Sequence, residues 1–103
     1  MARDISGLWT IVQSAGGNSI IFVTPVHQPD GAFGAQAMQL GNGVRGAGAG
    51  HVNGDFVGFV INWDNNTAGA YNAAFDAQGQ LHGATFDLRN PGSTAEWHSD
   101  RTF

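Results

Sequence analysis

The chain has 103 residues and a formal net charge of −4, and 12% of its residues are charged. This length suits one domain with a single modest core. The four cationic residues are scattered, without the basic cluster that follows a nucleic-acid backbone. No apolar run approaches the ~20 residues that cross a bilayer. We therefore expect neither a nucleic-acid partner nor a membrane.

Cysteine is absent, which excludes disulfides and thiolate metal sites. The first residues, MARDISG, lack the apolar segment of a secretion signal. Two locations stay open: the cytoplasm, or secretion with the leader already removed.

The sequence is punctuated by 16 glycines and 3 prolines. Interior glycine costs a helix ~1 kcal/mol and proline ~3 kcal/mol, so a long helix has almost nowhere to form. Between the turn residues lie segments of alternating hydrophobicity, which are typical of half-buried strands. These segments predict strands at 5–14, 18–28, 31–39, 44–52, 55–64, 67–77, 80–90 and 93–103.

The connections between these segments are too short for crossover helices, so neighbouring strands should pair antiparallel. Eight antiparallel strands can close a small barrel that is filled by side chains or holds one small ligand. The sequence therefore predicts an all-β protein, an eight-stranded antiparallel up-and-down β-barrel, with residues 1–103 as its single domain. Whether the lumen is filled or open is the functional question.

One predicted strand, 44–52, carries glycine on alternate positions, with Gly46, Gly48 and Gly50 on one face. Such a bare face lets a sheet bend sharply, or it admits a close neighbour such as a subunit or a ligand. Both interpretations stay open. Because charge is sparse and this face is bare, we expect a homo-oligomer, either a dimer or a tetramer.

Catalytic chemistry finds little support. Most carboxylates lie at turns, where aspartate is favoured for backbone reasons. The four histidines lie on four different segments, without the spacing that brings three or four metal ligands together. No nucleophile motif is present. We therefore expect no enzyme, no metal and no cofactor.

Six segments follow one another in an order that suggests a family: ISGLWT, DGAFGAQA, VGFVINWDNN, AYNAAFD, HGATFDL and AEWHSDRTF. They resemble the first, third, fifth, sixth, seventh and last strands of the avidin and streptavidin family. The resemblance extends over nearly the whole chain. It implies a barrel plugged at one end by Trp9, with a biotin-like ligand entering at the other end.

The resemblance also implies a set of ligand-binding residues. Trp63, Tyr71 and Phe86 stand where the family has aromatic walls of the biotin pocket. Trp97 stands where a tryptophan reaches into a neighbouring subunit's pocket. Asp100 stands where an aspartate accepts a hydrogen bond from the ureido group.

The family's polar donors, in contrast, are replaced. The first-strand donor position is Ile11, the third-strand tyrosine position is Gln36, and a nearby hydroxyl position is Met38. Gly69 replaces a hydroxyl residue on the sixth strand and leaves Thr67 one step away. Each lost hydrogen bond to a buried ligand group costs ~1–3 kcal/mol, so we expect biotin to bind weakly if at all.

Three functional hypotheses remain. The first is a non-enzymatic barrel that binds a small biotin-like ligand through Gln36, Met38, Trp63, Thr67, Tyr71, Phe86, Trp97 and Asp100. The second is a lectin-type carbohydrate-binding module, in which the strand-end aromatics and the loop 64–67 bind a sugar. The third is a structural barrel with a filled lumen. Interleaved polar residues, Gln13, Gln36, Asn62 and Thr67, include candidates for the convergent polar groups of a ligand site, with Asn62 expected to face outward.

Overall fold

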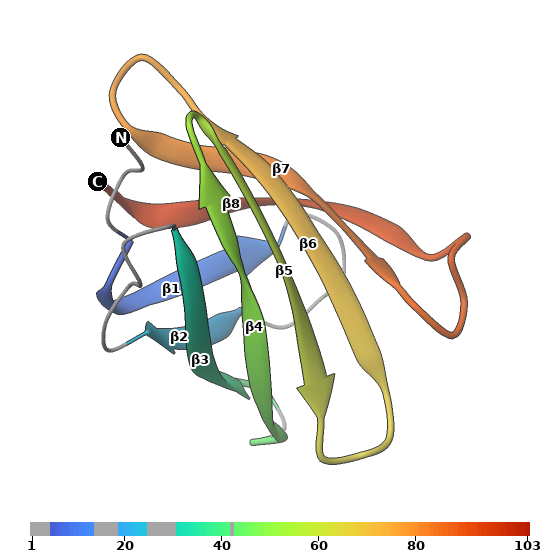
Figure 1. The fold of residues 1–103 in the computed structure, drawn as a ribbon. Coiled ribbons are helices and arrows are strands. Elements are labelled where there is room, and N and C mark those ends of the chain that lie inside the picture. The colour runs from blue at the N-terminus through green and yellow to red at the C-terminus, as the bar shows by residue number, and fades with distance from the viewer. Residues whose placement is uncertain (1–4, 14–18, 25–30, 42) are drawn as a thin grey trace.

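The computed structural model describes residues 5–13, 19–24, 31–41 and 43–103, and this part of the chain is all-β (Figure 1). The predicted all-β class is thereby confirmed. Each strand falls within a predicted segment, except that Asn53 extends one strand by a single residue. The strands are β1 (Gly7–Gln13), β2 (Ile20–Thr24), β3 (Ala32–Gln39), β4 (Arg45–Asn53), β5 (Phe56–Trp63), β6 (Ala68–Phe75), β7 (Gln80–Asp87) and β8 (Thr94–Thr102).

The strands form one antiparallel sheet that curls on itself. Each strand pairs with the next one along the chain, and β8 pairs with β1, so that the sheet is a closed barrel. The closing ladder is short and runs from the pair Ile11–Ser99 to the pair Gln13–Trp97. Figure 1 shows the long strands β4 to β6 crossing the front of the curled sheet. Within the described residues, no helix is long and apolar enough to cross a membrane.

One end of the barrel is filled by packed aromatic side chains. Trp9 and Trp97 stack with their ring centroids 6.4 Å apart, and Phe103 meets Trp9 edge-on at 5.2 Å. Phe59 lies edge-on to Trp97 at 5.9 Å, and Tyr71 stacks on Phe59 at 5.1 Å. Aromatic pairs at these separations add to the stabilisation from buried area. Trp9 therefore lies at the filled end, and Tyr71 is the last ring of the packed column.

The alternate glycines of β4 face the lumen. A Cβ on Gly46 would lie 2.7 Å from Cε3 of Trp63, and a Cβ on Gly50 would lie 2.5 Å from Cβ of Phe59. The close neighbour of the bare backbone is thus strand β5 of the same barrel, whose side chains lean over the glycines. The interpretation that a subunit packs on this glycine face is wrong, because the face points inward.

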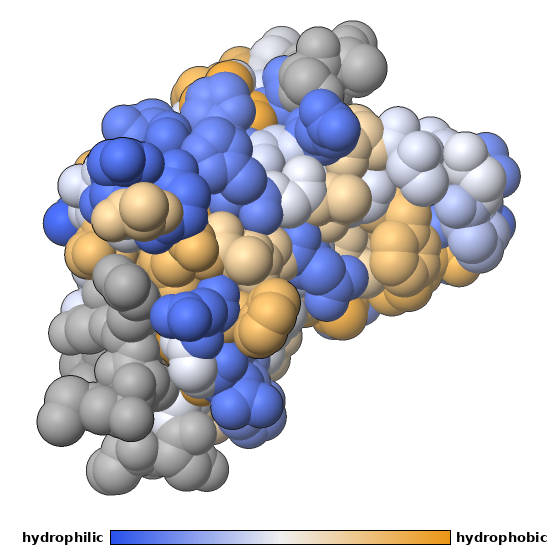
Figure 2. All heavy atoms as spheres, turned by 90° about the horizontal axis from the view of Figure 1, so that it is seen from above, coloured by the Kyte–Doolittle hydropathy of each residue, from blue (hydrophilic) through white to orange (hydrophobic). Residues whose placement is uncertain are grey.

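The outer face of β4 carries the intervening residues, among them Ala47 and Ala49, which are exposed. Larger exposed apolar side chains lie elsewhere on the surface, at Leu8, Phe56 and Leu40. Figure 2 shows, on one face of the molecule, hydrophobic residues lying among hydrophilic ones. Apolar atoms on a protein surface are ordinary when scattered and informative when they are contiguous.

Candidate ligand-binding pocket

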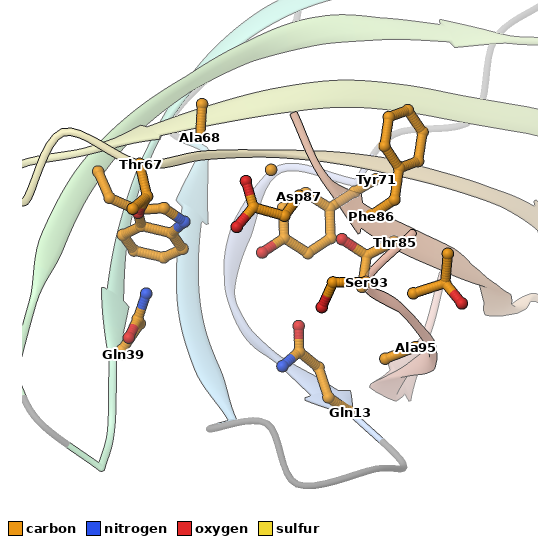
Figure 3. Close-up of a pocket in the computed structure, with 13 residues that line it drawn as sticks. Gln13, Gln39, Thr67, Ala68, Tyr71, Thr85, Phe86, Asp87, Ser93 and Ala95 are labelled. Carbon is orange, nitrogen blue, oxygen red and sulfur yellow. The ribbon is translucent and has the colours of Figure 1, made fainter. Parts of the chain in front are cut away.

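A cavity of about 360 Å³ lies at the end of the barrel away from Trp9 and Phe103. Its walls come from the last residues of β1, β3 and β5, the first residues of β6, and the hairpin between β7 and β8 (Figure 3). Antiparallel pairing brings these segments to one rim, because odd strands end where even strands begin. The polar side chains among its lining residues are Gln13, Gln39, Thr67, Tyr71, Thr85, Asp87, Ser93 and Thr94.

Two amides reach the pocket because they continue the inward rows of their strands. Gln13 follows Ile11 on the inner face of β1, and Gln39 follows Ala37 on the inner face of β3. Ile11 and Ala37 are buried in the core, whereas both glutamines are half-buried at the strand ends. Each amide offers two donors and an acceptor. The rows thus change from apolar to polar where the packed core ends.

Tyr71 forms the floor of the pocket and is only 4% exposed. Thr85 stands directly opposite it in the β6–β7 ladder. The side chains of Thr85 and Trp63 hydrogen-bond to the Tyr71 hydroxyl, and the indole takes part as a donor, since N–H is its one polar group. Burial raises the pKa of Tyr71 to about 12, and the nearby Asp87 carboxylate acts in the same direction. The phenol is therefore neutral throughout the physiological pH range.

Asp87 and Gly69 lie side by side above that floor. They are partners in the β6–β7 ladder, and both line the cavity. A Cβ on Gly69 would lie 3.1 Å from Cε1 of Tyr71. The absence of a side chain at Gly69 therefore leaves room for the Tyr71 ring and keeps the adjoining part of the cavity open. The Asp87 carboxylate is held by the backbone N–H of Arg89, which donates to Oδ1 at 2.8 Å. Figure 3 shows the Asp87 and Tyr71 side chains lying together, with Gln13 across from them.

The β5–β6 turn supports the aromatic wall at Trp63. The backbone N–H of Trp63 donates to the carbonyl of Thr67 at 2.8 Å. The side-chain oxygen of Asn65 accepts hydrogen bonds from the backbone and the hydroxyl of Thr67, at 3.2 and 2.6 Å. Asn66 takes the left-handed conformation, with φ of 68°. The loop 64–67 is thus a hairpin turn whose Asn65 side chain is engaged within the turn.

Four of the candidate residues from the sequence line this pocket: Trp63, Thr67, Tyr71 and Phe86. The first three are brought together around the cavity. Phe86 borders it from the outer side of β7, because its neighbour Thr85 takes the inward position, and its ring points away from the cavity in Figure 3.

The two candidates on β3, Gln36 and Met38, lie on the outer face of the sheet. The inward positions of this strand belong to Ala35 and Ala37, which are buried, and side chains alternate along a strand. Gln36 is exposed and Met38 is half-buried. Asn62 is also exposed, on the outer face of β5, as the alternation predicts.

Trp97 and Asp100, the β8 candidates, are also outside the pocket. Trp97 is 2% exposed, lies 6.1 Å from Tyr71 between ring centroids, and donates its indole N–H to the carbonyl of Ala84 at 3.1 Å. It belongs to the packed core. Asp100 is exposed, and its Oδ1 accepts the backbone N–H of Thr10 at 2.8 Å. Asp100 therefore ties β1 to β8 just beyond the short closing ladder.

Sequence reasoning did not single out Gln39, Thr85, Asp87 and Ser93 as site residues. The alternation of side chains predicts an inward position for the first three. Gln39 lies two residues after the buried Ala37, and Thr85 and Asp87 lie four and six residues after the buried Leu81. Ser93 lies between β7 and β8, where no strand parity applies, and its position depends on the hairpin.

A histidine cluster lies on the outer face, apart from this cavity. His82 stacks on His98 with centroids 5.9 Å apart, and its ring nitrogen lies 3.0 Å from a carboxylate oxygen of Asp76. The backbone N–H of Gln80 is the main cause that lowers the pKa of the Asp76 carboxyl, with smaller contributions that include His82. Among the described residues, no three histidine, aspartate or glutamate side chains converge as metal ligands would.

The pocket thus combines amide, hydroxyl and carboxylate groups with an indole wall and a neutral phenol, a set suited to binding a small polar ring. No protein-family model, curated protein or solved structure matches the chain. Inference about its function therefore depends on the geometry of this pocket.

Proposed function

We propose that the protein is a non-enzymatic, small-ligand-binding β-barrel of avidin type, with its ligand held in the pocket at the open end. The observation that carries this proposal is the division of the lumen. Stacked aromatics fill one end, and a cavity of about 360 Å³ with an aromatic wall and converging polar groups occupies the other. Small-molecule sites are commonly cavities of about 300–1,000 Å³ with this combination of groups.

A biotin-like ligand is the first candidate: a compact ring with hydrogen-bonding groups. The donors available to it are not those of the resembled family, because the first-strand donor position is the buried Ile11 and Gln36 faces outward. Gln13, Gln39 and Thr85 supply polar groups from other positions. Because this set differs from the one fitted to biotin, weak binding is expected, in keeping with a loss of ~1–3 kcal/mol for each unmatched buried group.

A simple carbohydrate is the second candidate. The indole of Trp63 offers an apolar face for a sugar ring, and the amides and hydroxyls around it suit sugar hydroxyls. The loop 64–67 contributes less to such a site than the sequence suggests, since Asn65 is bonded to Thr67. The cavity favours either binding hypothesis over a barrel with a wholly filled lumen.

A matched pair of cavity variants tests this proposal. Ala95 lines the pocket and Ala84 is exposed on the outer face of β7, so Ala95→Leu fills the cavity while Ala84→Leu adds the same side chain outside it. Biotin and a panel of simple sugars are titrated to millimolar concentration, with tryptophan fluorescence and melting temperature as readouts. We expect a signal that Ala95→Leu removes and Ala84→Leu keeps. The absence of any response, or a response that Ala95→Leu leaves unchanged, would contradict the proposal.

The assembly we propose is a homo-oligomer in which a second copy packs on the outer face of β4 and β5. Ala47 and Ala49 are exposed there beside the half-buried Val60, and Arg45 at one end is the charged residue of this row. A surface of small, uncharged side chains can approach its own copy closely, without like-charge repulsion across a two-fold interface.

A further inference from the structure

One charged side chain lines the pocket, and it is negative. Asp87 is the carboxylate among the described lining residues, and none of the chain's arginines is among them. The carboxylate lies close enough to the Tyr71 hydroxyl to influence its ionisation. A ligand that fills the cavity therefore meets this charge at the side of the floor.

The Asp87 carboxylate retains capacity for a ligand. Its Oδ1 accepts the backbone N–H of Arg89 at 2.8 Å, and within the described part of the chain it forms no ion pair. An ionised carboxylate offers about four acceptor sites, so one backbone hydrogen bond leaves most of them available. The charge is also half-buried, where its interactions are screened less than those of an exposed group.

The other walls suit a positive group and not a negative one. The aromatic face of the Trp63 indole attracts cations through its ring quadrupole. A ligand anion would instead lie beside Asp87 without a cationic side chain of the pocket to offset the repulsion. The whole chain adds a net charge of −4, which raises the local concentration of cations.

From these observations we propose that the ligand of this pocket carries a small cationic nitrogen group, such as an amidinium or a primary ammonium, that pairs with Asp87 beside the Tyr71 hydroxyl. The inference depends on the proposed function and names the ligand class of the same site. A planar amidinium can donate two parallel N–H bonds to one carboxylate, a geometry that makes such pairs strong.

The experiment uses three probes that share a benzene ring and differ in charge: benzamidine, benzamide and benzoate. Each is titrated into the full chain, and binding is followed by the melting temperature and by backbone amide shifts in NMR. We expect benzamidine to bind about tenfold more tightly than benzamide, in line with a charge-assisted bond, and benzoate to bind most weakly. Ala95→Leu should weaken the binding of benzamidine and benzamide.

Asp87→Asn isolates the carboxylate. Asparagine keeps an oxygen that accepts the Arg89 N–H, so the turn is retained while the charge is lost. We expect this variant to bring the benzamidine-to-benzamide ratio close to one, because the charge that favours benzamidine over benzamide is gone. Glu96→Gln on the outer face of β8 makes the same change in net charge outside the pocket, and it should preserve the ratio.

The outcomes separate the two proposals. If benzamidine and benzamide bind equally and Ala95→Leu weakens both, the cation inference is overturned while the ligand-binding function stands. If the preference for benzamidine survives Asp87→Asn, pairing with Asp87 is wrong. If Ala95→Leu does not alter benzamidine binding, the cation binds elsewhere and the inference fails. If no probe, biotin or sugar binds, both proposals fail.

Discussion

At the scale of single residues, Tyr71 joins the two halves of the lumen. One face of its ring stacks on Phe59 at 5.1 Å, which places it in the packed core. Its hydroxyl meets the side chains of Thr85 and Trp63 in the pocket. The ring is therefore fixed by the core, while the hydroxyl is presented to the cavity. A ligand group that reaches the floor meets a neutral hydroxyl in a fixed position.

The burial of Tyr71 predicts a loss of stability at alkaline pH. The pKa of this phenol is about 12 in the folded chain and 10 in the unfolded one. Its contribution is complete below pH 10 and declines as the pH rises towards 12, because only the unfolded chain then releases the proton. The full loss is on the order of 2–3 kcal/mol. Urea unfolding at successive pH values from about 9 upward measures this decline.

The control uses the chain's composition. Tyr71 is its one tyrosine and lysine is absent, so no other side chain type titrates between these pH values. Tyr71→Phe should show an unfolding free energy that changes little over the same range. The ultraviolet absorption of tyrosinate in the folded protein should have a midpoint of about 12. A midpoint near the ordinary value of 10 would show that the phenol is not held in this environment.

At the scale of elements, the inward glycines of strand β4 make room for the side chains of strand β5. A Cβ on Gly50 would lie 2.5 Å from Cβ of Phe59 and would also collide with the carbonyl of Gly58. Gly50→Ala should therefore lower the free energy of unfolding by about 1–3 kcal/mol, the usual cost of overpacking. Gly34→Ala in the adjacent β3 is the control, since its nearest neighbour would be 4.0 Å away. Urea denaturation should show a clear loss of stability for Gly50→Ala and little change for Gly34→Ala. Equal midpoints for the two variants would contradict the inward orientation of the β4 glycines.

The strands themselves could be predicted from the sequence because alternation and turn residues are local. The orientation of particular residues could not be taken from resemblance. Matching to the avidin family placed Gln36 and Met38 at the ligand, whereas the alternation with the buried Ala35 and Ala37 turns both outward. Where the two kinds of inference disagree, parity within the strand is the stronger guide, since a one-residue slip reverses every side chain.

Irregular features of the sheet could not be predicted from the sequence, because they depend on how two strands pair. The β7–β8 pairing shifts register between Gln80 and His82, and the buried Ser99 fills the gap. Its hydroxyl accepts the N–H of Leu81 at 3.0 Å and donates to the carbonyl of Arg101 at 2.6 Å. A serine on the inner face of a strand looks like an ordinary polar residue until the bulge that it satisfies is known.

At the scale of the whole molecule, the division between a filled and a hollow end depends on contacts between distant strands. Trp97 of β8 packs against Phe59 of β5 and Trp9 of β1. No local pattern shows that these rings share one end, which is why the sequence left Trp97 as a pocket candidate. Once the register is known, the rings fill the lumen as far as Tyr71. The polar inward residues beyond it then define the site.

The exposed outer face of β4 and β5 predicts the surface through which copies of the chain assemble. If copies pack through Ala47 and Ala49, a two-fold axis places each substituted residue near its symmetry mate or against an apolar partner. Ala49→Glu would then bury a charge without a partner, which costs several kcal/mol. Light scattering should give the unaltered chain a mass of two or four times the 10.8 kDa of one chain, and should give Ala49→Glu the mass of one chain. Gln78→Glu, an equal change of charge in the exposed β6–β7 turn, should leave the assembly intact. A single-chain mass for the unaltered protein, or an assembly that survives Ala49→Glu, would place the interface elsewhere or remove it, and the ligand pocket would then belong to one barrel alone.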